Sequence, residues 1–214
     1  MEKRNLTVTL DKAREWYNSG NESLKEIALQ AYSENELKFN FRNITSFEKA
    51  CEVLDINYDD IDSVIGDIII FSGSKFSASM FKLNIIRKAL NLGQDLHLTK
   101  DPKDSCIYIP FNPFETEIST YYRNELSSGK MKIIGKIKHE GVLYNVLGGS
   151  AIVGGSAGVG CFTSGYGVGV AHADCGFLGC ASEEIAKHFG EHFGMLITEA
   201  KYGDLEDFEI VYTC

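Results

Sequence analysis

The stretch that decides the fold is SEEIAKHFGEHFGMLITEAK, residues 182–201. Its apolar residues recur every three or four positions, so they form one stripe along an α-helix. The stripe consists of Ile185, Ala186, Phe189, Phe193, Leu196 and Ile197. Ser182 has a side chain suited to a helix N-cap, and two glutamates follow it in the first turn, where the helix dipole favours negative charge. We therefore expect a long amphipathic helix near the end of the chain.

Before that helix, the chain carries the patterns of β-strands. Residues 106–111 have the composition of a strand, which Pro110 and Pro113 are expected to end. Residues 131–137 and 142–147 flank a polar turn, an arrangement typical of a β-hairpin. These patterns predict an antiparallel sheet.

A side-chain-poor stretch near residues 148–179 follows the hairpin. It contains two strand-like runs, residues 159–163 and 166–174. In the second run, one face would consist only of Gly167, Gly169, Ala171 and Ala173. A helix, another sheet or a ligand has to pack directly on the backbone of such a face, which makes it a candidate binding surface. Residues 141–171 lack charged side chains but are poor in Leu, Ile and Phe, so we expect a sheet there rather than a membrane helix.

The part of the chain up to residue 93 carries repeated helix patterns. Its helix-start signals are Thr9 or Asp11, Asn21, Ser33 with Glu36, and Thr45 with Glu48. Residues 57–62 are polar and acidic and predict a break, whereas residues 77–92 predict a longer helix that Gly93 is well placed to end. The apolar run at residues 64–71 fits either a buried strand or a helix, because periodicity does not separate them at this length.

The predicted fold class is α+β. A mainly helical region, residues 1–93, precedes an antiparallel glycine-rich β-sheet with its closing helix, residues 94–214. These two regions form either separate units or one continuous domain. Composition supports a globular protein, with 44% hydrophobic and 24% charged residues.

The net charge and the cysteines bear on two questions, whether the chain binds nucleic acid and in which compartment it works. The chain of 214 residues has a formal net charge of −9, which disfavours DNA or RNA binding because such binding depends on neutralising phosphates. The first residues, 1–5, are charged and show no apolar signal segment, so we expect a cytoplasmic protein with six reduced cysteines. No membrane partner is expected.

Four blocks of the chain resemble uncharacterised proteins of gut Bacteroidota and of their phages or prophages. The blocks are residues 15–26 (EWYNSGNESLKE), residues 46–51 (SFEKAC), the helix around Ile86, Lys88, Ala89, Leu90 and Asn91, and the closing helix with Ser182, Glu184, Ala186, Phe189, Gly190 and Phe193. Similar proteins often have an aromatic-rich segment before the closing helix, where this chain has glycine and alanine. The resemblance implies a bacterial host and a mobile genetic setting, without an activity.

The densest group of reactive side chains is a candidate metal site. It consists of His172, Cys175, Cys180, His188 and His192. His188 and His192 are four residues apart, a spacing at which two helical side chains share one face and can share a zinc ion. The group lacks a Cys-x-x-Cys or His-Glu-x-x-His motif, so structural histidines and buried thiols are the competing interpretation.

Two catalytic hypotheses are weaker. Cys161, Cys175 or Cys180 beside His172 has the residue types of a cysteine nucleophile, which needs a thiolate next to a base. The glycine-rich segment has neither the lysine of a Walker loop nor the third glycine of a dinucleotide-binding loop, so nucleotide binding is not supported. No catalytic residue is assigned and no cofactor is expected, with zinc as the alternative.

Tyr121 and Tyr122 lie in a segment that the patterns do not assign, and they suit a binding surface if exposed. The favoured hypothesis is a non-enzymatic phage-associated binding or assembly protein, with a protein partner or a second copy of the chain on its Gly/Ala face. The alternative is an enzyme or metal-binding protein that uses the Cys/His group.

Overall fold

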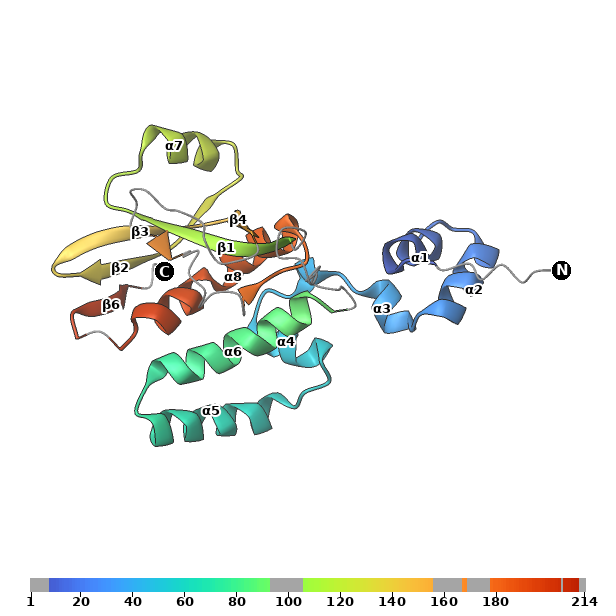
Figure 1. The fold of residues 1–214 in the computed structure, drawn as a ribbon, viewed down its shortest axis with the longest axis horizontal. Helices are drawn as coiled ribbons and strands as arrows, with labels where there is room; N and C mark the ends of the chain where they lie inside the picture. Colours follow the sequence, from blue (N-terminus) through green and yellow to red (C-terminus); the bar gives the residue numbers. More distant parts are fainter. Residues whose placement is uncertain (1–7, 93–105, 156–166, 169–177, 205, 212–214) are drawn as a thin grey trace.

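The computed structural model describes residues 8–92, 106–155, 167–168, 178–204 and 206–211. Helices occupy the N-terminal half, and an antiparallel sheet with a closing helix follows (Figure 1). The predicted α+β class is therefore confirmed. The strand predicted at residues 159–163, and all but two residues of the one predicted at 166–174, lie outside the described residues.

The first three helices form a small unit, here called the N-terminal module. They are α1 (Leu10–Tyr17), α2 (Glu22–Ala31) and α3 (Glu34–Lys38). Figure 1 shows the module standing away from the remaining helices and the sheet, which we call the body. Its core is small, with Ala13, Ala28 and Leu37 buried and Trp16 and Tyr17 packed against them.

Each helix of the module begins at a residue that the sequence indicated. The side chain of Thr9 accepts a hydrogen bond from the backbone N–H of Lys12, and that of Asn21 accepts from Ser23 and Leu24. Ser33 caps the third helix in the expected capping box. Short polar side chains thus satisfy the free N–H groups that every helix start exposes.

The helices of the body follow in the order η1 (Phe41–Asn43), α4 (Phe47–Val53), α5 (Tyr58–Ser72) and α6 (Lys75–Leu90). The ambiguous apolar run at 64–71 is helical, within α5. The break predicted at residues 57–62 is wrong, because Asn57 caps this helix and its acidic residues occupy the first turn, which the helix dipole favours. Gly73 ends it in the left-handed conformation, at φ 64°. The start predicted at Thr45 shifts to Ser46, whose side chain accepts from Lys49.

The sheet contains six strands in the described residues. They are β1 (Cys106–Glu115), β2 (Lys132–His139), β3 (Val142–Gly148), β4 (Ser150–Gly155), β5 (Gly167–Val168) and β6 (Phe208–Val211), with α7 (Thr120–Ser127) between β1 and β2. The order is β4-β1-β3-β2-β6, β5 also pairs with β1, and every pairing is antiparallel. The predicted hairpin is confirmed: it turns at Glu140 and Gly141, both at positive φ.

The prediction that Pro110 and Pro113 end the first strand is wrong. β1 continues to Glu115 and changes its partner along the way. Pro110 lies opposite Ala151 of β4, whereas Pro113 lies opposite Gly167 of β5. A proline lacks only its own backbone N–H, so each of the two prolines removes a single hydrogen-bond donor from β1.

The closing helix, α8 (Glu183–Tyr202), organises the main core. Ser182 caps it as expected, by accepting a hydrogen bond from Ile185. The helix lies between α6 and the sheet, and Phe189 is fully buried there. The core unites buried residues of both halves of the chain, among them Ile44, Ala50, Leu83, Ile86, Leu90, Ile185, Phe189 and Ile197.

Glycines allow α8 to lie very close to the sheet. A Cβ atom on Gly194 would lie 2.5 Å from Nδ2 of Asn112, and one on Gly148 would lie 2.9 Å from the carbonyl oxygen of Gly190. Asn112 is fully buried and donates from Nδ2 to the carbonyl oxygens of Leu147 and Gly190, at 3.0 and 2.8 Å. The helix and two strands are thus joined by one side chain.

The start of α6 is capped from the far end of the chain. Ser74, at the N-cap position, makes no cap hydrogen bond itself. Its hydroxyl instead donates to Asp204, which also accepts from the backbone N–H groups of Lys75 and Phe76. The hydrogen bond from Ser74 is the main cause of the lowered pKa of Asp204. This carboxylate fixes the turn between α5 and α6 to the end of α8.

Candidate functional site

A pocket of about 440 Å³ lies beside the first half of α8. It is lined by Phe41, Arg42, Lys130, Gly149, Glu184, Lys187, His188, Glu191 and His192. It therefore contains both candidate histidines of the closing helix, together with the segment that leads from the N-terminal module into the body.

His188 holds that segment against α8. Its Nε2 atom lies 2.8 Å from the carbonyl oxygen of Ile44, and its ring meets that of Phe41 in a T-shaped contact at a centroid distance of 5.5 Å. A carbonyl only accepts hydrogen bonds, so Nε2 carries the hydrogen. Burial lowers the pKa of His188, which keeps the ring neutral. The ring of His192 lies 4.3 Å away, centroid to centroid.

The charged residues of the pocket already have partners. Arg42 pairs with Glu184 at 2.6 Å, Glu191 pairs with Lys132, and Lys187 pairs with Glu183 at 2.6 Å. The two carboxylates of the pocket are thus neutralised by cations of the same protein. The arrangement stabilises the contact between α8 and its surroundings, and it offers no concentrated charge to a ligand.

Of the candidate metal residues, the described parts of the chain bring only His188 and His192 together. Cys180 is fully buried, where its backbone pairs with that of Tyr108. Burial raises the pKa of its thiol to about 12, so it remains protonated. Within those parts no three His, Cys, Asp or Glu side chains form a group that could hold a metal ion. His172, Cys175 and Cys161 lie outside the described residues.

The tyrosine pair lies on α7, a short helix that the sequence did not predict. Tyr121 is 66% exposed, and its ring meets that of Tyr122 edge to face at 5.1 Å. Tyr122 is partly buried, which raises its pKa. Of the candidate Gly/Ala face, Gly167 lies in β5, whereas Gly169, Ala171 and Ala173 lie outside the described residues.

Among the described residues, the two most exposed large apolar side chains, those of Phe71 and Ile70, lie elsewhere, at the turn between α5 and α6. The helices α5 and α6 form a helical hairpin, and we call Ile69, Ile70, Phe71 and Phe76, which lie beside its turn, the hairpin tip. Phe71 is 88% exposed and Ile70 is 76% exposed. Sequence reasoning missed this surface, although a signal was present: four apolar residues in a row, 68–71, cannot all lie on one face of a helix.

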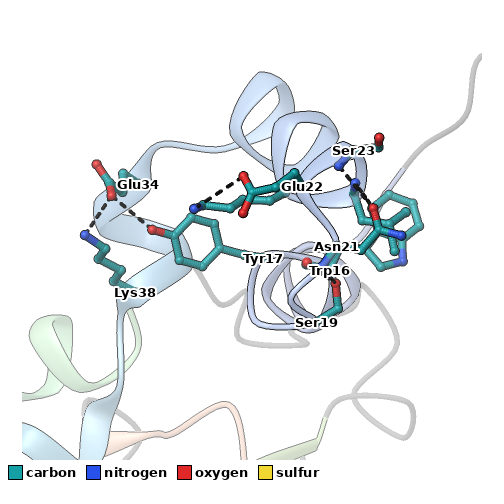
Figure 2. Close-up of polar contacts among 10 residues, drawn as sticks. Trp16, Tyr17, Ser19, Asn21, Glu22, Ser23, Glu34 and Lys38 are labelled. Carbon is teal, nitrogen blue, oxygen red and sulfur yellow. Dashed lines mark hydrogen bonds and ion pairs between the residues drawn. The ribbon is translucent and has the colours of Figure 1, made fainter.

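The N-terminal module offers a different kind of surface. Figure 2 shows its polar contacts: Glu34 accepts from Tyr17 at 3.0 Å and pairs with Lys38 at 2.6 Å. The hydroxyl of Ser19 donates to the carbonyl oxygen of Trp16, at 2.7 Å. These groups serve the ends of the module's own helices, so the contacts are structural.

Comparisons of the chain with known protein families, with curated proteins and with solved structures found no match. Among the helices in the described ranges, none is both long enough and apolar enough to cross a membrane.

Proposed function

We propose that this chain is a non-enzymatic protein-binding or assembly protein, and that the hairpin tip is its binding surface. The observation that carries the proposal is the exposure of Phe71 and Ile70. Burying one large apolar side chain is worth about 1.5–3 kcal/mol, and large exposed apolar patches commonly mark interaction sites. A partner that covers the tip would gain this free energy.

The tip is well held, which favours binding. α6 packs along α8 through Leu83 and Ile86, both fully buried, and Asp204 fixes its first turn. An exposed side chain on a rigid support loses less conformational entropy when a partner binds. Phe76 and the turn that follows Phe71 are therefore held in place before a partner binds.

The setting expected from the resemblance to proteins of gut Bacteroidota and of their phages is the cytoplasm of a bacterial host, and the resemblance adds no activity. The competing hypothesis is an enzyme or zinc protein that uses the Cys/His group. Its one support in the described structure is the contact between the rings of His188 and His192. Elemental analysis of the purified protein tests it, because one equivalent of bound metal per chain would favour the competing hypothesis.

Site-specific photo-crosslinking tests the main proposal. Benzoylphenylalanine replaces Phe71 in one variant and Tyr121, a matched exposed aromatic residue, in another. We expect illumination of producing cells to give one adduct of defined mass at position 71 and none at position 121. An adduct only at 121 would move the binding surface to α7, and no adduct at 71 would refute the proposal.

A further inference from the structure

We draw no further inference here: the strongest candidate, the patch of exposed apolar side chains at the turn between α5 and α6, carries nothing beyond the proposed function, because nothing in the described part of the structure shows what covers it.

Discussion

The N-terminal module and the body show two ways of stabilising helices. In the module, each helix start is satisfied by a side chain at most three residues away, and the core has three buried residues among those that the structure describes. In the body, α6 is capped by Asp204, which is 129 residues away from Lys75, and the core joins α4, α6 and α8. The helices of the module are thus stabilised by hydrogen bonds between near neighbours in sequence, whereas those of the body are stabilised by contacts between residues that are distant in sequence.

The largest expected change in stability comes from a substitution in the core of the body, and it should leave the module unaffected. Phe189→Ala should destabilise the body by about 3–5 kcal/mol, because it removes a fully buried ring and leaves a cavity. Trp16 is the only tryptophan of the chain and lies in the module, so its fluorescence reports on the module alone, whereas circular dichroism reports mainly on the body. We expect the unfolding midpoint measured by circular dichroism, which reports on the body, to decrease, and the midpoint measured by Trp16 fluorescence to stay the same. An equal shift of both signals would mean that the regions unfold together.

A second substitution tests the close contact of α8 with the sheet. Gly194→Ala should destabilise the body by about 1–3 kcal/mol, since the added Cβ would lie 2.4 Å from Cδ1 of Ile134 and must displace it. Gly190→Ala is the matched control, because its nearest contact would be 3.3 Å, from Pro110. Urea denaturation measures both. Equal effects would show that helix propensity, rather than space, governs these positions.

The module should respond to the loss of a single cap. Asn21→Ala removes the acceptor for the N–H groups of Ser23 and Leu24 and should destabilise the module by about 1 kcal/mol. Trp16 fluorescence should therefore show a lower midpoint, with the body transition unchanged. Asn21→Ser, which keeps an acceptor, should restore most of the loss.

The smallest expected effect concerns pH and the segment that joins the two regions. Burial lowers the pKa of His188 below that of the unfolded chain, so the unfolded state binds a proton first as the pH falls. The stability due to neutral His188 is thus fully present above about pH 6.5 and is lost as the pH decreases from there towards the folded pKa. His188→Gln, whose amide can still donate to Ile44, should flatten the dependence of the body's unfolding free energy on pH between 7 and 5. If the pH dependence of the unfolding free energy is the same in this variant as in the wild type, a group other than His188 causes it.

The candidate site was only partly predictable. His188 and His192 do share one side of α8, as their spacing indicated, but the hydrogen bond from His188 to Ile44 joins residues 144 positions apart. Cys180 belongs to the core, a role that the sequence left open. The exposure of Phe71 depends on which face of α5 meets α6, and a run of consecutive apolar residues does not specify that face.

The sequence by itself determined the elements whose signals lie within a few residues. Caps at Thr9, Asn21, Ser33 and Ser182, and the apolar stripe of α8, correctly predict four helices, because a cap or a helical turn involves only near neighbours. Only the tertiary structure decided the strand order, the continuation of β1 past its prolines, the pairing of β6 with β2 and the capping of α6 by Asp204. Each of these depends on contacts between residues that are distant in sequence, and such contacts form only when the whole chain folds.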